Sequence, residues 1–335
     1  MKKNTLRALA AAAGMLVLIF DSRAALNGAR EGIDLCIRTL IPSLFPFFVL
    51  STLLTGSMIG QPIGILRPVC ELCGIPEGAE SLLSVGLLGG YPVGAQNIAQ
   101  AYRTGNISKS DAERMLAFCN NAGPAFIFGI LGQMFSKPYI PWLLWGIHAV
   151  SALLVGILLS KVRGISASLS VRVVSVSDAL ESSVRVMALV CGWVILFRMI
   201  LTILEQWILW MAPDTIQIVI AGIMELSNGC VQLSIVQPEG LRFLLASVML
   251  SAGGLCVTMQ TVSVVRGLSL KVYFRGKIMQ SVFSFLLSSL LQNVFEPEHR
   301  IQIPAIVLVI SLVIICACVL RKCKKRSSIP ASVGV

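Results

Sequence analysis

Charged residues are scarce in this sequence. Of its 335 residues only 13% are Asp, Glu, Lys or Arg, whereas a soluble domain carries roughly a quarter, and 56% are hydrophobic. The longest polar connection between apolar stretches, 161–182, is too short to form a soluble domain of its own. The composition excludes a soluble globular protein and predicts an all-α polytopic membrane protein.

The sequence also lacks the clusters that carry chemistry. It has two histidines, no glycine-rich nucleotide loop and no set of Ser, His and Asp at a catalytic spacing. Most of its ten cysteines lie in or beside apolar segments, where Cys packs as a small apolar side chain. Cys70 and Cys73 have the spacing of a metal or redox motif, but there is neither a second pair nor a nearby His. We therefore expect no enzyme activity, no cofactor and no metal.

Apolar runs that are long enough, or nearly long enough, to cross about 30 Å of hydrocarbon as helices recur along the whole chain. Six are continuous, at 6–20, 40–60, 141–160, 186–211, 280–294 and 303–320. The first follows two lysines and resembles a signal peptide, but because further spans follow it we expect an uncleaved helix. The stretch 24–40 mixes charged and apolar residues, which is typical of an interfacial amphipathic helix.

Four more apolar runs are interrupted near their centres, two in each half of the chain. They are 81–102, broken at 89–92; 115–134, broken at 120–124; 216–237, broken at 225–229; and 242–264, broken at 251–254. Interrupted hydrophobic segments at corresponding places in two halves indicate the binding site of a transporter.

The net charge of +11 comes from short basic runs beside apolar segments. No nucleic-acid motif accompanies them, so we expect no nucleic-acid partner and assign the charge to membrane orientation. Four clusters should face the cytoplasm: Lys2 and Lys3; Lys161, Arg163 and Arg172; Arg266, Lys271, Arg275 and Lys277; and 321–326. Five apolar runs separate the first two clusters and three separate the next two. One run in each set must therefore enter and leave on the same side.

The runs 81–102 and 216–237 are the natural re-entrant hairpins. Each has a central break and two arms of about ten residues, or roughly 15 Å of helix, which reaches half-way across the bilayer. The first hairpin then opens to the cytoplasm and the second to the outside. Each half has the order span, hairpin, broken span, span, in opposite orientations, so the sequence predicts an inverted-topology repeat with two re-entrant helical hairpins and broken spans.

The predicted organisation follows from this order. It comprises a membrane helix (1–23), a first repeat (24–164), a second inverted repeat (165–296), a final membrane helix (297–320) and a basic cytoplasmic tail (321–335). We expect a multi-pass protein of the cell membrane with both termini in the cytoplasm.

Polar side chains gather at the four breaks. Several helix N-termini should meet there at mid-membrane, and their partial positive charge favours a small anionic solute. Taken singly, each polar side chain also suits an interhelical hydrogen bond. The predicted substrate-binding residues are Tyr91, Gly94, Asn97, Asn120, Asn121, Ser227, Asn228, Arg198 and Glu225.

Arg198 and Glu225 are ionisable residues within apolar runs, where charge is costly and indicates function or pairing. Arg198 either meets the solute or forms a salt bridge to Glu225 or Glu205. Glu225 either carries a coupling proton or pairs with Arg198. His148 is expected to pack as a neutral imidazole rather than to relay protons.

Motifs in the first half resemble a known family. They are Ile41-Pro42-Ser43-Leu44-Phe45-Pro46-Phe47-Phe48, Gly89-Gly90-Tyr91-Pro92-Val93-Gly94-Ala95 and Asn120-Asn121-Ala122-Gly123-Pro124. Over about 32–164 the chain resembles sporulation integral membrane proteins with a nucleoside-recognition (Gate) domain, a group that includes the dipicolinate importer-type protein of spore-forming bacteria. The second half is matched only in arrangement.

The resemblance implies a role in endospore formation and passage of dipicolinate or a related anion. The positions of this chain that match the family motifs are Tyr91, Pro92, Gly94, Asn121, Gly123 and Pro124. Two alternatives remain: a sporulation scaffold that transports nothing, and a nucleoside transporter. The expected partners are a small anionic solute and the lipid bilayer, and a homo-oligomer is compatible with this interpretation.

Overall fold

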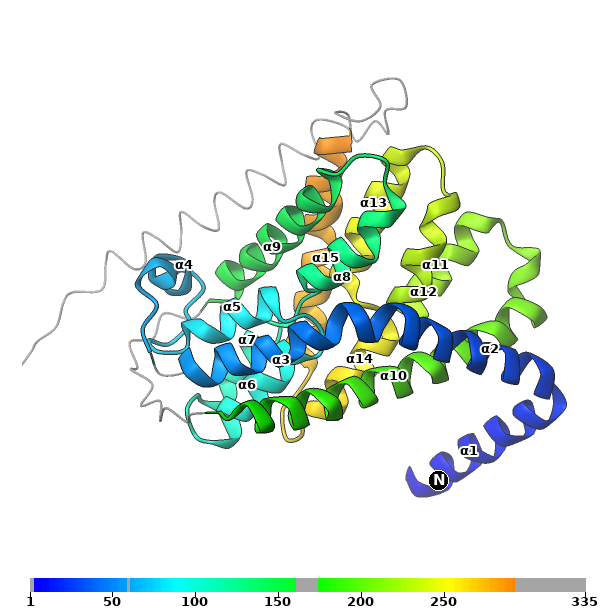
Figure 1. Ribbon diagram of the computed structural model, residues 1–335, viewed down its shortest axis with the longest axis horizontal. Helices are drawn as coiled ribbons and strands as arrows, with labels where there is room; N and C mark the ends of the chain where they lie inside the picture. Colours follow the sequence, from blue (N-terminus) through cyan, green and yellow to red (C-terminus); the bar gives the residue numbers. More distant parts are fainter. Residues whose placement is uncertain (1–2, 59–60, 161–173, 293–335) are drawn as a thin grey trace, which may run out of the picture.

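The computed structural model describes residues 3–58, 61–160 and 174–292, most of which are helical (Figure 1). The first half contains α1 (Lys3–Phe20), α2 (Ser22–Leu35), a π-helical turn (Cys36–Leu40), α3 (Ile41–Met58), α4 (Arg67–Leu72), α5 (Glu80–Leu88), α6 (Val93–Arg103), α7 (Lys109–Met115), α8 (Pro124–Gly129) and α9 (Ile140–Leu159). The second half contains α10 (Val176–Trp207), α11 (Asp214–Met224), α12 (Leu226–Gln232), α13 (Glu239–Ala252), α14 (Gly254–Val264) and α15 (Lys271–Gln292). Short 3₁₀ turns lie at Gly64–Leu66, Leu131–Met134, Leu209–Met211 and Leu233–Ile235.

Some predicted features lie outside the described residues. They are Lys2, the cluster of Lys161, Arg163 and Arg172, the final helix 297–320 and the tail 321–335.

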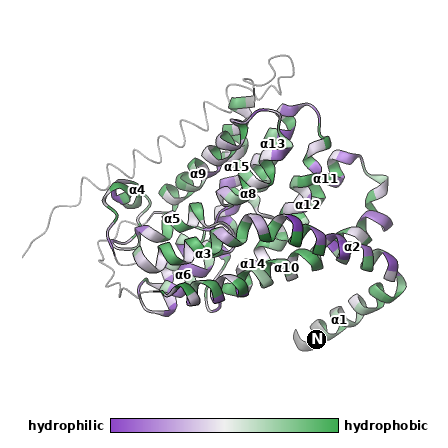
Figure 2. Ribbon diagram, in the orientation of Figure 1, coloured by the Kyte–Doolittle hydropathy of each residue, from purple (hydrophilic) through white to green (hydrophobic). Residues whose placement is uncertain are grey.

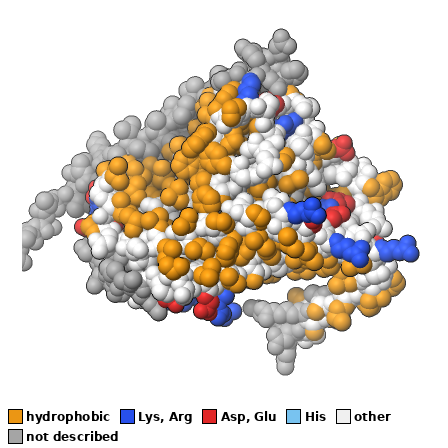
Figure 3. Space-filling model, viewed as in Figure 1, with side chains coloured by type: hydrophobic (Ala, Val, Ile, Leu, Met, Phe, Trp, Pro, Cys, Tyr) orange, Lys and Arg blue, Asp and Glu red, His pale blue; other side chains and the backbone are white. Residues whose placement is uncertain are grey.

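Four helical segments are long and apolar enough to cross a membrane. They are Ser22–Met58, Ile140–Leu159, Val176–Trp207 and Glu239–Val264. Hydrophobic residues run along α9, whereas α2 is more hydrophilic (Figure 2). Hydrophobic side chains also cover much of the surface in Figure 3, as expected for a protein that meets lipid. The prediction of an all-α polytopic membrane protein is confirmed.

The longest helices form an antiparallel pair. Ser22–Met58 is one helix of 37 residues that includes the π-helical turn, and it packs along α10 (Figure 1). A Cβ atom at Gly28 would lie 2.7 Å from the Cα of Met199, and one at Gly32 would lie 2.8 Å from the Cα of Ile195. Small residues four apart allow such close backbone approach between membrane helices. The predicted amphipathic segment is therefore helical and leads without a break into the span, whereas its location at the membrane interface stays a prediction.

All four predicted interruptions are present in the structure. The arms of each predicted hairpin, α5 with α6 and α11 with α12, pack against each other. In contrast, α13 and α14 together form the 26-residue candidate span Glu239–Val264. Its break falls at Gly253 and Gly254, both with φ of +75°, a conformation that glycine adopts without a steric penalty. Whether the hairpins are re-entrant stays a prediction.

The first hairpin encloses the unwound part of the first broken span. A Cβ atom at Gly86 would lie 2.3 Å from the carbonyl oxygen of Cys119, and one at Gly94 would lie 2.2 Å from the same oxygen. The second hairpin closes on itself, since a Cβ atom at Gly229 would lie 2.3 Å from the Cα of Gly222. Glycine at these positions lets the backbone pass the hairpin arms closely.

The two halves have the same order of elements. Each begins with a long helix, continues with a hairpin and a broken span, and ends with α9 or α15. Each broken span also carries a buried arginine near its start, Arg114 or Arg242, whose guanidinium donates to backbone carbonyl oxygens. These features agree with a duplication, whereas the inverted orientation of the halves stays a prediction.

Two contacts join the halves at their loops. The backbone N–H of Ser269 donates to the carboxylate of Glu113 at 2.9 Å, and the N–H of Ser136 donates to Glu239 at 3.0 Å. In the predicted topology the first pair is cytoplasmic and the second is external. Each contact therefore joins a helix residue of one half, Glu113 in α7 or Glu239 at the start of α13, to a loop of the other half that is predicted to lie on the same side.

Candidate functional site: a buried polar junction between the halves

A small cavity of about 40 Å³ lies between the two halves of the molecule. The predicted site residues Tyr91, Glu225 and Ser227 line it, together with Gly90 and Gly123 from the first two breaks. Sites for organic ligands usually have volumes of about 300–1,000 Å³, so this cavity has room for water and is closed to a solute.

A buried lysine lies beside this cavity. Lys277 of α15 is 5% exposed, and its Nζ atom donates to Tyr91 Oη at 2.9 Å, to the backbone oxygen of Asn120 at 2.6 Å and to Gln280 Oε1 at 2.8 Å. Asn121 Oδ1 is a fourth acceptor at 3.4 Å. The three closest acceptors match the three protons of an ammonium group.

The charge of this lysine is surrounded by neutral groups. Nζ lies 5.0 Å from the ring centroid of Tyr91 and 5.8 Å from that of Tyr273, which is the range of cation–π contacts. No carboxylate in the described parts of the chain forms a salt bridge with Lys277. The prediction that Lys277 belongs to a cytoplasmic basic cluster is wrong, whereas Arg266, Lys271 and Arg275 are exposed.

The paired asparagines at the break connect the halves. Asn120 Oδ1 accepts a bond from the N–H of Ala95 at 3.2 Å, and its Nδ2 donates to Thr261 Oγ1 at 3.0 Å. Asn121 Oδ1 accepts from Gln280 Nε2 at 3.0 Å. Both side chains are fully buried. These residues therefore form the interhelical bonds of the alternative interpretation and at the same time belong to the junction around Lys277.

A second chain of polar groups starts at His148 of α9. Its Nε2 atom accepts from the N–H of Ala122 at 3.0 Å, so in the neutral ring Nδ1 carries the proton and donates to Ser251 Oγ at 3.3 Å. Ser251 is bonded to Ser284, which donates to Ser151 at 3.1 Å. The imidazole is a packed neutral ring in this arrangement, as predicted, and it links the breaks of both broken spans.

Glu225 caps the N-terminus of α12. Its carboxylate accepts from the backbone N–H of Ser227 at 3.1 Å and of Asn228 at 2.8 Å, and from Asn228 Nδ2 at 2.8 Å. In a similar way, Asn120 Oδ1 accepts from the backbone N–H of Ala95 near the start of α6. Protein groups therefore accept from N–H donors at the starts of α6 and α12, two of the helix N-termini predicted to attract an anion, and Lys277 is the basic side chain at the junction.

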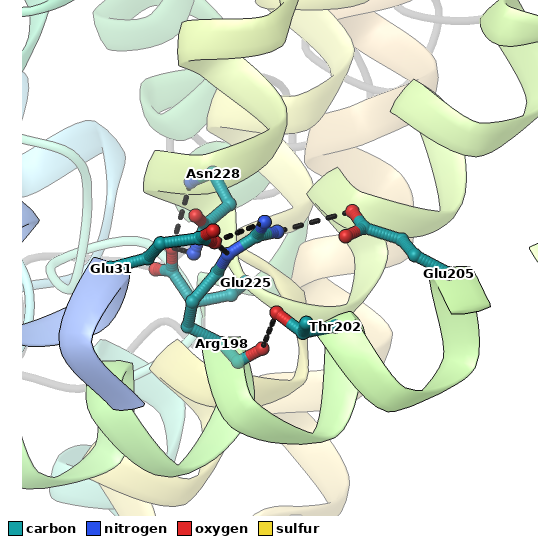
Figure 4. A network of polar contacts seen from close by, with 6 residues as sticks. All are labelled: Glu31, Arg198, Thr202, Glu205, Glu225 and Asn228. Atoms are coloured by element: carbon teal, nitrogen blue, oxygen red, sulfur yellow. Dashed lines mark hydrogen bonds and ion pairs between the residues drawn. The ribbon is translucent and has the colours of Figure 1, made fainter. Parts of the chain in front are cut away.

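Arg198 lies in an ion-pair cluster (Figure 4). Its guanidinium is 2.6 Å from the carboxylate of Glu31 and 3.1 Å from that of Glu205. The predicted salt bridge to Glu205 is confirmed, Glu31 is a partner that the sequence did not indicate, and in the described residues Arg198 forms no salt bridge with Glu225. Contact of Arg198 with the solute stays a prediction. Because Arg198 joins α10 to α2, its contacts favour a structural role.

Two further predicted residues lie apart from the cavity. Gly94 packs against the unwound backbone at Cys119, as described above. Asn97 donates to the backbone oxygen of Val93 at 3.0 Å and lines a separate polar hollow beside Gln100 and Asp178. The structure therefore brings together Tyr91, Glu225 and Ser227 around the cavity, with Asn120 and Asn121 beside Lys277, and leaves Asn97 and Arg198 outside.

The Cys70 and Cys73 pair is buried in the packing around α4. Burial raises the pKa of the Cys70 thiol to about 12, which disfavours the thiolate needed for redox or metal chemistry. In the described part of the chain, no group of three His, Cys, Asp or Glu side chains is placed to hold a metal ion.

Part of the chain is similar to a sporulation protein. Over 146 residues it is 32% identical to "Sporulation integral membrane protein YlbJ" of Bacillus subtilis (strain 168), a stretch covering 42% of this chain and 35% of that relative. The matched stretch thus spans about a third of the relative's length. The similarity confirms the predicted resemblance to sporulation integral membrane proteins over that stretch. No family model matches, so the Gate domain is not confirmed, and no solved structure matches.

Proposed function

We propose that this chain is a sporulation-associated membrane transporter or facilitator of a small organic anion of the dipicolinate type. Transport would be driven by a solute gradient, with the protein acting neither as an enzyme nor as an ATP-driven pump. The name of the Bacillus subtilis relative supports the link to sporulation. The transport activity and the solute rest on the arrangement of the site.

The observation that carries this proposal is the meeting of helix breaks from both halves at a buried polar junction. Non-helical backbone within a membrane is tolerated where it is buried in protein or lines a cavity. Here the unwound segment at Asn120 and Asn121 contacts α14 and α15 of the other half. In transporters built from two repeats, the solute site lies at such an interface.

An anionic solute suits the charges of this junction. Lys277 supplies a buried positive charge, and the acceptors around it are neutral. Glu225 is the buried acid on the cavity wall, and the N–H groups at the start of α12 already occupy its carboxylate. A buried cation surrounded by neutral groups favours binding of an anion from outside.

Two other functions make different predictions. A non-transporting scaffold has no need for polar groups at helix breaks, and the purified protein would take up no solute. A nucleoside transporter would bind a neutral solute and would be insensitive to solute charge. The polar junction favours transport over scaffolding, and Lys277 favours an anion over a nucleoside.

Uptake by the purified protein in proteoliposomes tests the proposal. We expect concentration-dependent uptake of radiolabelled dipicolinate above that of empty liposomes, and no comparable uptake of a nucleoside. Asn121→Ala should reduce uptake because it removes a buried bond between the halves. Arg198→Ala decides whether Arg198 contacts the solute. Absence of dipicolinate uptake by folded wild-type protein would refute the proposal.

A further inference from the structure

We infer that Lys277 is the residue that binds the carboxylate of the transported anion, and that Tyr91 covers it until the solute arrives. This inference rests on the proposed function. It assigns a binding role to a residue of α15 that the sequence places among the cytoplasmic charges, and it gives the solute site one defined positive group.

The first argument is the position of the ammonium group. Lys277 lies within α15, and its bonds to Asn120 and Asn121 reach the unwound segment of the first broken span. Its bonds to Tyr91 Oη and Gln280 Oε1 complete its surroundings. A purely structural lysine with this degree of burial would be expected to pair with a carboxylate, because an unpaired buried charge costs free energy. Of the 16 acidic residues, all but Glu296 and Glu298 lie in the described part of the chain, and none of those described forms a salt bridge with Lys277.

The second argument is the location of Tyr91. Tyr91 lines the cavity whereas Lys277 does not, and the ammonium group of Lys277 donates to the phenol oxygen of Tyr91, so Tyr91 links the ammonium group to the cavity wall. Tyr91 Oη accepts from Lys277 and donates to the backbone oxygen of Leu250 at 3.2 Å. The phenol therefore connects the tip of the first hairpin to α13, just before its break at Gly253.

This geometry allows the solute to replace Tyr91 as a hydrogen-bond acceptor of Lys277. Once the junction opens far enough to admit the solute, its carboxylate can take the place of Tyr91 Oη as an acceptor of a Lys277 proton, while the phenol keeps its own proton and its bond to Leu250. The exchange replaces a neutral acceptor of the ammonium group with a carboxylate, so it adds the Coulomb attraction of an ion pair in a buried site of low dielectric constant. The backbone oxygen of Asn120 and the amide of Gln280 hold the ammonium in place throughout.

The experiment compares a charged solute with a neutral one. Dipicolinate and its uncharged diamide, pyridine-2,6-dicarboxamide, have similar shapes and differ in charge. Lys277→Gln should raise the apparent KM for dipicolinate by at least about 30-fold, the cost typical of removing one partner of a buried charge pair, and should leave binding of the diamide unchanged. Lys271→Gln is the matched control, because Lys271 is an exposed lysine of the same helix. It should have no effect.

Two further variants test the same site without removing the lysine. Gln280→Glu places a carboxylate of nearly equal shape beside the ammonium, so it should weaken dipicolinate binding even if Lys277→Gln fails to fold. Tyr91→Phe removes the competing acceptor, so it should lower the apparent KM for dipicolinate by about fivefold, the worth of one net hydrogen bond. Dipicolinate should raise the thermal unfolding midpoint of the wild type and not that of Lys277→Gln.

Several outcomes would overturn the inference. Equal dipicolinate kinetics in the wild type and in Lys277→Gln or Gln280→Glu would exclude Lys277 as the anion site. Weaker binding in Tyr91→Phe would show that the phenol is itself a ligand and not a cover. A wild type that takes up no dipicolinate would instead refute the proposed function, so the two failures are distinguishable.

Discussion

The Nε2 atom of His148 accepts a hydrogen bond from the backbone N–H of Ala122 at 3.0 Å, so a side chain of α9 holds the first broken span at its break. The other ring nitrogen contacts Ser251, two residues before the break of the second broken span. One imidazole therefore joins the irregular backbone of one half to that of the other.

Replacing this imidazole should destabilise the protein, because it leaves a buried backbone N–H without a hydrogen-bond acceptor. His148→Ala leaves the N–H of Ala122 buried without its acceptor and should lower the free energy of unfolding by about 1–3 kcal/mol. His148→Gln can place an amide oxygen near the position of Nε2, so its loss should be smaller. Thermal unfolding of the detergent-solubilised variants measures both. Equal losses would mean that packing, not the hydrogen bond, determines the role of His148.

The close approach of the first hairpin to the unwound segment predicts a steric effect. In Gly94→Ala the new methyl group would lie 2.2 Å from the oxygen of Cys119, which forces the backbone apart. We expect a loss of about 1–3 kcal/mol or more in stability, with reduced yield of folded protein. Gly192→Ala is the control, because a Cβ atom there meets nothing within 4 Å in helix α10. That variant should be neutral or slightly more stable.

The sequence predicted the breaks well, because glycine, proline and adjacent polar residues interrupt apolar runs by known backbone effects. The breaks near Gly90, Asn120, Glu225 and Gly253 are all present. Which residues surround the junction was harder to predict. Contacts such as that between Asn120 and Thr261 depend on how the two halves pack, and spacing along the chain does not encode that packing.

The burial of Lys277 was not predicted, because a basic residue near the end of an apolar run is ordinarily assigned to the loop whose charge orients the protein in the membrane. A different pattern could have identified it. Lys277, Gln280, Ser284 and Ser288 recur at helical spacing and are all buried, whereas Ile278 and Val282 are exposed on α15. A polar stripe on an otherwise apolar helix indicates a side that faces protein rather than lipid. Counted as a helical face, this stripe marks Lys277 as an internal residue.

The ion pairs of Arg198 predict an effect on stability rather than on transport. The Arg198 side chain is 13% exposed and its guanidinium contacts two carboxylates, so Arg198→Gln should cost about 1–2 kcal/mol, between the values for exposed and fully buried pairs. The apparent KM for dipicolinate should not change.

Arg185→Gln provides the comparison on the same helix. Arg185 pairs with Glu181, and both side chains are mostly exposed, so the loss should stay below about 0.5 kcal/mol. Unfolding and uptake are measured on the same preparations. A large rise in KM for Arg198→Gln with unchanged stability would instead mean that Arg198 contacts the solute.

The contacts between loops give a direct test of the predicted topology. Glu113 accepts a bond from the N–H of Ser269, so the loop before α7 and the loop before α15 lie at the same end of the molecule. Lys109 and Arg266 are exposed beside these loops, and Lys137 is exposed in the loop before α9. In a background without native cysteines, Lys109→Cys and Arg266→Cys should react with a membrane-impermeant maleimide from the cytoplasmic side, and Lys137→Cys from the outside. Because the first broken span separates Lys109 from Lys137, labelling of both from one side would mean that this segment does not cross the membrane. Labelling of Lys109→Cys and Arg266→Cys from opposite sides would contradict the inverted arrangement of the two halves.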